Sequence, residues 1–374
     1  MTQISFDSLK PKYKITKPIR LIELFAGIGA QAKALENLGV DFEHYRICEF
    51  DKYAVKSYNA IHGTDFTVSD ITALKGEDLG ITDTDKYCYI MTYSFPCQDL
   101  SICGKQKGMS KGGNTRSGLL WEVERLLNEV DNLPEVLLME NVIQVHSEKN
   151  RADFNKWISF LESKGYSNYY ANLNSRNYGV AQNRNRCFMV SILGDYYYEF
   201  PHPEPLNKTM ADYLEPTVDE SYFLSLKGVK YVINPKKDRF VKINPQIGCA
   251  ITARANSNWN GNFVSCDLAG TLCGEKWERM LDSCRRVYLQ LGISPTVITQ
   301  QGGNQDIKIE VNQEPLKLRK LTPRECFRLM SFSDEDIDKC YSIGMSDSQL
   351  YKQAGNSIVV RVLEKIFEQM IRSE

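Results

Sequence analysis

The pattern of apolar and polar positions predicts alternating strands and helices in the first half of the chain. Short apolar runs at 20–24, 45–48, 87–91 and 136–139 have the length of buried strands. Between them, over 28–38, 53–61 and 119–130, apolar residues recur at helical spacing. This alternation favours an α/β fold with a mostly parallel sheet.

A glycine-containing turn joins the first apolar run to the first helix. Its sequence, Phe25-Ala-Gly-Ile-Gly-Ala30, places Gly27 and Gly29 where a ligand could lie against the backbone. Strand, glycine turn and helix form the layout of a nucleotide-binding unit in a doubly wound sheet. The GxGxxG spacing is absent, which favours a nucleoside ligand without phosphates. The alternative is a pair of glycines that only permits tight packing.

Acidic residues follow the second apolar run. Glu49 ends this run, at the position where such sheets bind the hydroxyl pair of a ribose. The alternative is that Glu49 and Asp51 cap the next helix, because acids favour a helix N-terminus. Asp70 and Ile71 then lie in a loop, where a third strand would end.

The third apolar run ends in Ser-Phe-Pro-Cys, with Pro96 fixing the backbone before Cys97. A cysteine on a rigid turn at the carboxyl end of a strand is well placed to act as a nucleophile. The alternative is a buried structural thiol. The segment 98–118, which follows, is rich in Gly and Lys, and we expect either a mobile lid whose cations contact phosphates or a solvated loop.

Composition narrows the class of protein without identifying it. The 374 residues are 42% hydrophobic and 25% charged, with a net charge of −1, as in an ordinary globular protein. Any polyanion must therefore bind a local patch. The 11 Cys lack a CxxC pair and there are only 4 His, so we expect no metal site and a reduced, cytoplasmic protein. We see no leader peptide and no membrane-spanning segment.

The pattern changes near residue 200. Prolines at 201, 203 and 205 mark a boundary, and residues 203–316 contain short β-like runs with many Asn, Gly and Thr. Some polar side chains of this region are of types that read base edges or contact phosphates: Lys236, Lys237, Arg239, Lys242, Arg254, Asn256, Asn258, Gln300, Gln301 and Asn304. Thr322-Pro-Arg-Glu325 then predicts a capped helix start. The last apolar pattern, over 359–370, predicts a terminal helix.

Short motifs in a fixed order make the chain resemble a known family. They are Phe25-Ala-Gly-x-Gly, Pro96-Cys97-Gln98, Glu140-Asn141-Val142 and Gln182-x-Arg184-x-Arg186. In these the sequence resembles the bacterial and phage DNA (cytosine-5) methyltransferases. Ser94-Phe-Pro-Cys-Gln-Asp99 and 114–121 look most like the mycoplasma-type enzymes. The resemblance covers roughly residues 19–200 and 318–372.

The resemblance implies a Rossmann-like, S-adenosylmethionine-dependent methyltransferase fold with an inserted, mainly β target-recognition domain. The expected parts are 1–202, 203–316 and 317–374, the first and last forming the catalytic domain. Cys97 would attack carbon 6 of cytosine, Glu140 would bind ring nitrogen 3, and Arg186 would bind the carbonyl oxygen. Arg184 would support Glu140 or the loop. No residue is assigned to removal of the carbon-5 proton, for which ordered water is a candidate.

The resemblance also implies the ligands. S-adenosyl-L-methionine would contact Phe25, Gly27, Gly29, Glu49, Asp70, Ile71, Pro96, Asn356 and Ser357. The macromolecular substrate would be double-stranded DNA, bound by a monomer. Whether a companion restriction endonuclease accompanies the protein stays open. Two alternatives remain: a transfer-RNA cytosine-5 methyltransferase of the same family, and a DNA-binding regulator that keeps the fold without turnover.

Overall fold

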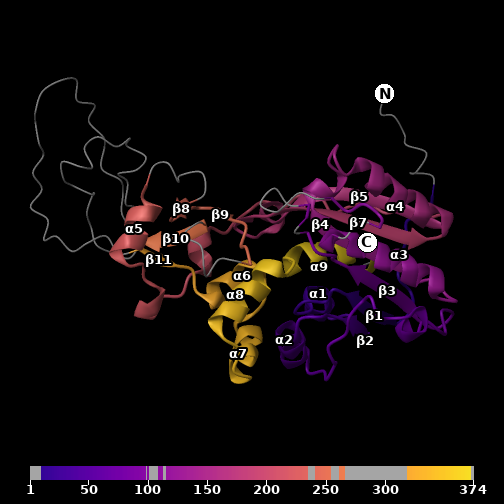
Figure 1. The fold of residues 1–374 in the computed structure, drawn as a ribbon, viewed down its shortest axis with the longest axis horizontal. Coiled ribbons are helices and arrows are strands. Elements are labelled where there is room, and N and C mark those ends of the chain that lie inside the picture. Colours follow the sequence, from indigo (N-terminus) through magenta and orange to yellow (C-terminus); the bar gives the residue numbers. More distant parts are fainter. Residues whose placement is uncertain are drawn as a thin grey trace, which may run out of the picture.

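The structure, a computed structural model, describes residues 10–97, 99–100, 108–112, 115–234, 241–253, 261–265 and 318–371. The molecule is elongated (Figure 1). A large sheet with its helices occupies one end, and a smaller sheet occupies the other. Helices α6 (Pro323–Leu329), α7 (Asp334–Ser342) and α8 (Asp347–Asn356) lie between the two.

The large sheet has six strands in the order β2-β1-β3-β4-β7-β5. Their bounds are β1 Ile19–Leu24, β2 Phe42–Cys48, β3 Cys88–Tyr93, β4 Val136–Val142, β5 Tyr166–Asn174 and β7 Asn185–Leu193. The first four strands pair in parallel, whereas β7 runs antiparallel to both β4 and β5. The mostly parallel α/β sheet predicted from the sequence is therefore confirmed, and β1 lies at the point where the strand order reverses.

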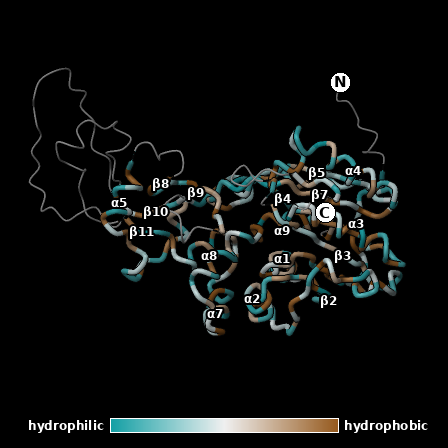
Figure 2. The backbone as a smooth tube through the Cα atoms, viewed as in Figure 1, coloured by the Kyte–Doolittle hydropathy of each residue, from teal (hydrophilic) through white to brown (hydrophobic). Residues whose placement is uncertain are grey.

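Two helical layers bury the large sheet. On one face, Leu21, Ile90 and Leu138 pack with helices α1 (Ala30–Asn37), α2 (Lys52–His62) and α9 (Val360–Ile371). On the other, Leu24 and Met91 pack with α3 (Leu120–Glu129) and α4 (Arg151–Ser163). Successive side chains of a strand point to opposite faces, so burial on both faces requires continuous apolar runs. In Figure 2, hydrophobic segments run through this interior.

The terminal helix packs beside the first βα unit. Helix α9 lies beside α1, and the Asn37 side chain donates a hydrogen bond to Glu364 at 2.7 Å. Helix α6 begins as predicted, because Thr322 and Glu325 form a capping box with Pro323 in the first turn. The C-terminal segment therefore completes the layer over the first βα unit.

A second, smaller sheet forms from two strands within residues 241–265 and one strand that begins at Leu318. Strands β8 (Val241–Ile243), β10 (Gly261–Ser265) and β11 (Leu318–Lys320) pair in the order β11-β10-β8. Helix α5 (Leu226–Val232) packs against it through Val229 and Phe263. A two-stranded pair, β6 (Gln182–Asn183) with β9 (Gly248–Cys249), connects this region to the large-sheet part.

Two local predictions were wrong. Residues 64–70 form no strand, and the third strand in the chain is β3. Ser117, which the sequence places as the cap of the helical pattern at 119–130, does not cap α3, because a 3₁₀ turn over Arg116–Leu119 precedes the helix and Thr115 caps that turn. Among the described residues, no helix is long and apolar enough to cross a membrane.

Candidate active site

The register of the parallel strands gathers the predicted site residues at one edge of the sheet. Leu24 of β1 pairs with Cys48 of β2 and with Tyr93 of β3, and Tyr93 pairs with Met139 of β4. Each of these residues is followed by a predicted site segment. The glycine turn, Glu49, the Cys97 turn and Glu140 therefore lie along one edge, beside the switch point where such sheets bind ligands.

The glycine turn is held by the end of β2. Phe25 and Ala26 both donate backbone hydrogen bonds to the Cys48 carbonyl, at 2.7 and 3.2 Å. Phe25, Gly27 and Gly29 have φ of 59°, 59° and 78°, a left-handed conformation that glycine adopts without strain. A Cβ on Gly27 would meet nothing within 4 Å, so the space beside it is open.

The structure separates the roles of the two acids that follow β2. Asp51 caps α2, because its side chain accepts a hydrogen bond from the Tyr53 amide at 2.9 Å. Glu49 does not cap this helix. Its Oε2 accepts from the Gly27 amide at 2.9 Å, and its Oε1 accepts from the Asp51 amide at 2.8 Å. Burial raises the pKa of Glu49, because the buried carboxylate loses contact with water. A ligand that forms hydrogen bonds with this carboxyl would replace the water that it has lost.

The loop at Asp70 lies next to Glu49. The Ser69 amide donates to the Glu49 carbonyl at 3.0 Å, and Ile71 is buried. Asp70 is exposed, and its Oδ1 accepts from the Thr72 amide at 2.9 Å in a local turn. The structure therefore brings Asp70 and Ile71 to the same edge without a strand in front of them.

The Cys97 turn is fixed by two side chains to which the sequence analysis gave no such role. Asn141 donates to the Phe95 carbonyl at 2.9 Å, and Ser117 donates to the Pro96 carbonyl at 2.7 Å. Both side chains are buried. No spacing rule predicts these contacts, although a polar residue beside an apolar run is a signal of buried hydrogen bonding.

The segment after Cys97 is anchored at the ends that are described. The Asp99 side chain accepts from the Arg116 amide at 2.8 Å, and Trp121 donates to the Met109 carbonyl at 2.6 Å. Lys111 pairs with Glu124 at 2.7 Å instead of facing outward alone. Gln98, Lys105 and Lys107 lie outside the described residues. The lid and its phosphate contacts therefore stay a prediction.

Glu140 and Arg186 form an ion pair across adjacent strands, with 3.2 Å between Oε1 and Nε. Glu140 lies within β4, one residue beyond the predicted end of the apolar run, and only 8% of it is exposed. Burial raises the pKa of Glu140 more than Arg186 and Arg184 lower it. The carboxyl is thereby biased toward its protonated form, which donates a hydrogen bond.

Cys97 is partly buried beside this pair. Burial and the charge of Glu140 raise the pKa of the thiol, while Arg186 and Arg184 oppose the shift. Because the thiolate is the nucleophile, this raised pKa favours the unreactive thiol form of Cys97 in the protein without ligands. Cys97 nevertheless lies within reach of both charges, because Glu140 and Arg186 both act on the pKa of the thiol and Arg186 also acts on the pKa of Glu140.

Arg184 forms no hydrogen bond or ion pair with Glu140 within the described part of the chain, although its charge lowers the pKa of Glu140, and its role in supporting Glu140 or the loop stays a prediction. Its guanidinium donates to the backbone carbonyls of Ile251, Gly355 and Ser357, at 2.8, 3.1 and 2.6 Å. Arg184 is 5% exposed, and burial lowers its pKa. The side chain therefore ties the end of β6 to Ile251 and to the end of α8.

Gln182 makes a second connection at the same place. It accepts from the Ile251 amide at 2.9 Å and donates to the Leu329 carbonyl at 2.8 Å. Ile251 is thus held on its amide by Gln182 and on its carbonyl by Arg184. A Cβ on Gly355 would lie 2.2 Å from the Ala253 amide nitrogen, so the glycine is needed for this close packing.

Asn356 and Ser357 end helix α8 at this junction. Asn356 is exposed, and Ser357 is buried with its carbonyl bound to Arg184. Helix α8 also packs on α2, where Gln353 donates to the Tyr53 carbonyl at 3.0 Å. The structure thus connects the predicted C-terminal cofactor residues with Arg184 and with the first βα units.

Comparison with known proteins decides the family. Residues 19–372 match the family model described as C-5 cytosine-specific DNA methylase. The chain belongs to this family. This cytosine methylase is 29% identical to the type II methyltransferase M2.ScrFI of Lactococcus lactis subsp. cremoris over 95% of the chain and 100% of that protein. It is 30% identical to the orphan methyltransferase M.SssI of Spiroplasma monobiae, over 95% of the chain and 98% of that protein.

Solved structures confirm the fold of this cytosine methylase. The S. pombe Dnmt2 methyltransferase superposes with a TM-score of 0.66 at 22% identity, covering 94% of this chain and 97% of that one. The Entamoeba histolytica methyltransferase EhMeth gives a TM-score of 0.68 at 20% identity, covering 95% and 98%. The resemblance drawn from the motifs is confirmed, and the protein is a DNA (cytosine-5) methyltransferase.

The base-reading residues of the cytosine methylase are not tested. Of the polar side chains proposed from the sequence, only Lys242, exposed on β8, lies among the described residues. The other nine, from Lys236 to Asn304, lie outside them. The base of the recognition region is described, however. There Arg319 and Glu325 form a buried ion pair at 2.8 Å.

Proposed function

We propose that this methylase transfers a methyl group from S-adenosyl-L-methionine to carbon 5 of a cytosine flipped out of duplex DNA, through a covalent adduct with Cys97. The observation that carries the proposal is the sheet register. In this register Cys97 follows the end of β3, Glu140 lies near the end of the adjacent parallel strand β4, and Arg186 pairs with Glu140. A nucleophile, a carboxyl with a raised pKa and a forked cation are the groups that addition to a pyrimidine requires.

The cofactor residues fit a nucleoside ligand with a sulfonium methyl group. The glycine turn leaves open space at Gly27, and the carboxyl of Glu49 is placed for ribose hydroxyls. The buried Ser69 and Ser94 hydroxyls beside this edge have no hydrogen-bond partner, as expected where a polar ligand completes the site. We propose that these contacts are joined by Phe25, Gly29, Asp70, Ile71, Pro96, Asn356 and Ser357. When bound, S-adenosyl-L-methionine supplies an electrophilic methyl group.

Cys97 starts the reaction on the base. Its thiolate forms a bond from Sγ to carbon 6, and the ring electrons move toward carbon 5, which then takes up the methyl group. Protonated Glu140 donates to ring nitrogen 3, and Arg186 donates to the carbonyl oxygen, so both withdraw electron density during the attack. Removal of the carbon-5 proton, with ordered water as the candidate base, lets the carbon–sulfur bond break and frees Cys97.

Because the pKa of Cys97 is raised in the free protein, its thiolate would form when the cytosine and the cofactor bind. A bound cytosine and the cationic cofactor both lie beside the thiol in this proposal, and a nearby positive charge favours the thiolate. Arg184 and Arg186 already act in this direction. The free protein would therefore keep Cys97 mostly as the thiol, which protects it from oxidation between turnovers.

The target base must leave the helix, because carbon 6 of a stacked cytosine is out of reach of a protein thiol. We propose that residues 203–316 form the target-recognition domain, inserted between catalytic segments 1–202 and 317–374. Strand β11, just after this insertion, pairs with β10 and so joins its sheet. Whether a companion endonuclease exists stays open, because M2.ScrFI is named a type II methyltransferase whereas M.SssI is named an orphan methyltransferase.

Methyl transfer from labelled cofactor tests this proposal. We expect duplex DNA to accept label from the purified chain, with transfer RNA unlabelled, and Cys97→Ser to abolish the transfer. Bisulfite sequencing of DNA from an expressing host would give the target site. Labelling of transfer RNA alone would instead favour the RNA-directed alternative, and DNA binding without any labelling would favour the regulator.

A further inference from the structure

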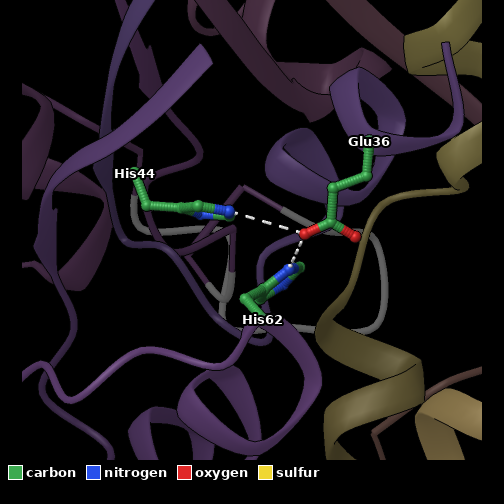
Figure 3. Close-up of side chains that lie close together, drawn as sticks. All are labelled: Glu36, His44 and His62. Atoms are coloured by element: carbon green, nitrogen blue, oxygen red, sulfur yellow. Dashed lines mark hydrogen bonds and ion pairs between the residues drawn. The ribbon is translucent and has the colours of Figure 1, made fainter. Parts of the chain in front are cut away.

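Three metal-ligating side chains meet at one point outside the active site. Glu36 comes from α1, His44 from β2, and His62 is the last residue of α2 (Figure 3). Oε1 of Glu36 lies 2.6 Å from Nδ1 of His62 and 3.5 Å from Nε2 of His44. These three ligand atoms all lie within 4.8 Å of one another.

The outer nitrogen of each ring already has a partner that fixes its proton. Nε2 of His62 lies 3.1 Å from the Ile28 carbonyl, which only accepts, so this nitrogen carries a hydrogen. Nδ1 of His44 lies 3.1 Å from the Tyr58 hydroxyl. That hydroxyl donates its own hydrogen to Glu23 at 2.6 Å, so its oxygen accepts from His44.

When the rings are neutral, the inner nitrogen of each ring therefore carries a lone pair and no hydrogen. Nδ1 of His62 and Nε2 of His44 both face Oε1 of Glu36, which is itself an acceptor. Three acceptors directed at one another require a shared cation. An extra proton on His62 is one solution, and a metal ion is the other.

We propose that Glu36, His44 and His62 bind a divalent metal ion of the zinc class. Two imidazoles and one carboxylate, with a position left for water, are a common zinc ligand set. Ligating histidines normally donate their other nitrogen to a carbonyl or a similar acceptor, as His62 does to Ile28 and His44 does to Tyr58. Imidazole also suits nickel, cobalt and copper, whereas magnesium and calcium prefer oxygen ligands alone.

The distances require only a small rearrangement. Ligand atoms about 2.0–2.1 Å from a tetrahedral zinc ion lie roughly 3.3 Å apart. The separation of 3.5 Å between Glu36 and His44 is close to this value. The 2.6 Å contact between Glu36 and His62 is a hydrogen-bond length and would have to open by somewhat under 1 Å. The Glu36 side chain is 29% exposed, which leaves room for that movement.

The surroundings support a cation at this point. The side chains of Glu36 and His44 are 29% and 19% exposed, so an ion has a path from solvent, whereas the His62 ring is fully buried. Lys33 pairs with Oε2 of Glu36 at 3.5 Å but lies closer to Asp336, at 2.8 Å. Glu23 adds a further acidic group behind Tyr58.

The site is placed to stiffen the cofactor turn from behind. A Cβ on Gly29 would lie 2.2 Å from Nε2 of His62, so the ring packs directly on this turn. An ion held by α1, β2 and the end of α2 would fix the Ile28 carbonyl through His62. The low histidine content gave no sign of this site, because its ligands are 8 and 18 residues apart and match no zinc spacing.

Cobalt and zinc binding to the full chain tests the proposal. Protein treated with a chelator would be titrated with Co²⁺, whose visible spectrum reports tetrahedral coordination, and with Zn²⁺ by calorimetry. The variants are His44→Gln and Glu36→Gln, the second of which keeps an oxygen facing His62. His202→Gln is the matched control, because His202 lies 3.6 Å from Glu199 on the surface without a third ligand. Circular dichroism checks that each variant folds.

We expect one equivalent of metal to bind, with a tetrahedral cobalt spectrum free of thiolate bands. Affinity should fall roughly tenfold or more in both variants and stay unchanged in the control. Three results would overturn the proposal: no binding by the unmodified protein, thiolate bands that assign the ion to cysteine, or unchanged affinity in both variants. No DNA or methyl donor is needed, so the outcome is independent of the proposed function.

Discussion

Glu140 and Arg186 pair across the antiparallel strands β4 and β7, with 3.2 Å between Oε1 and Nε. The backbone partner of Arg186 in this ladder is Val142, two residues beyond Glu140. The pair thus stands at the end of the ladder, next to Cys97. Because Arg186 is paired and burial still raises the pKa of Glu140, the carboxyl is held where it can keep a proton for the cytosine ring.

Glu140→Gln should remove this proton donor without disturbing the packing. We expect kcat to fall about 10²–10⁴-fold, the usual contribution of a positioned acid, with DNA affinity nearly unchanged. Single-turnover methylation and a DNA-binding titration separate the two. Glu124→Gln, which breaks only the exposed pair with Lys111, is the control. Equal losses of kcat in both variants would contradict a chemical role for Glu140.

The same substitution should increase stability at neutral pH. The folded pKa of Glu140 is raised, so the folded state binds the proton more tightly than the unfolded state does. The free energy of unfolding therefore decreases as the pH rises from the unfolded pKa through the folded one. Glu140→Gln removes this loss and should raise the melting temperature by about 1–3 °C at neutral pH. The gain should disappear below the ordinary glutamate pKa, and thermal scans at several pH values would measure it.

Glu49→Ala should weaken cofactor binding and leave the chemistry intact. The variant loses the carboxyl placed for ribose, which also accepts from the Gly27 amide. Hydrogen bonds to a charged group contribute about 1.5–3 kcal/mol, so KM for the methyl donor should rise roughly 10–100-fold with kcat little changed. Glu43→Ala, on the preceding strand β2 and paired with Arg20, is the control. An unchanged KM would mean that Glu49 only supports the turn.

Ser117→Ala should loosen the Cys97 turn. Its hydroxyl donates to the Pro96 carbonyl at 2.7 Å, and loss of the bond should cost about 1 kcal/mol of stability. We expect kcat to fall roughly tenfold, because a small displacement of a nucleophile slows attack. Ser163→Ala removes the same kind of bond at the exposed end of α4, to the Phe160 carbonyl at 2.6 Å, and should leave kcat unchanged.

Arg184→Lys tests the link between the catalytic edge and the recognition region. A lysine keeps the charge but cannot reach all three carbonyls that the guanidinium binds. Each carbonyl left without a partner costs about 1–3 kcal/mol. We expect a lower melting temperature and faster hydrogen exchange at the Ile251 amide. Exposed Arg176 is the control position, and Arg176→Lys should change neither quantity.

The sequence predicted the central part of the fold because its strands are buried on both faces. Burial of both faces produces the apolar runs of β1, β3 and β4, and the site segments lie at or just after the ends of these strands. The edge strand β2 is largely half-buried or exposed, and only its last apolar residues indicated it. Adjacent parallel strands bring their carboxyl ends together whatever the helices between them, so Cys97 and Glu140 could be placed from pattern and family motifs alone.

Long-range contacts escaped prediction for the opposite reason. Arg184 lies 67 residues from Ile251 and 173 from Ser357 in the chain, and no local pattern indicates such partners. The cluster of Glu36, His44 and His62 likewise depends on how α1, β2 and α2 pack. Ser117 was assigned to the wrong contact because a 3₁₀ turn shifts the start of α3.

Trapping the adduct tests the central claim most directly. In duplex DNA with 5-fluorocytosine at the target position, fluorine replaces the proton that must leave carbon 5, so the bond between Cys97 and carbon 6 persists. With S-adenosyl-L-methionine present, we predict a complex between the chain and the DNA that survives denaturation and is absent in Cys97→Ser. Methylation of ordinary DNA by Cys97→Ser at the normal rate would contradict the account.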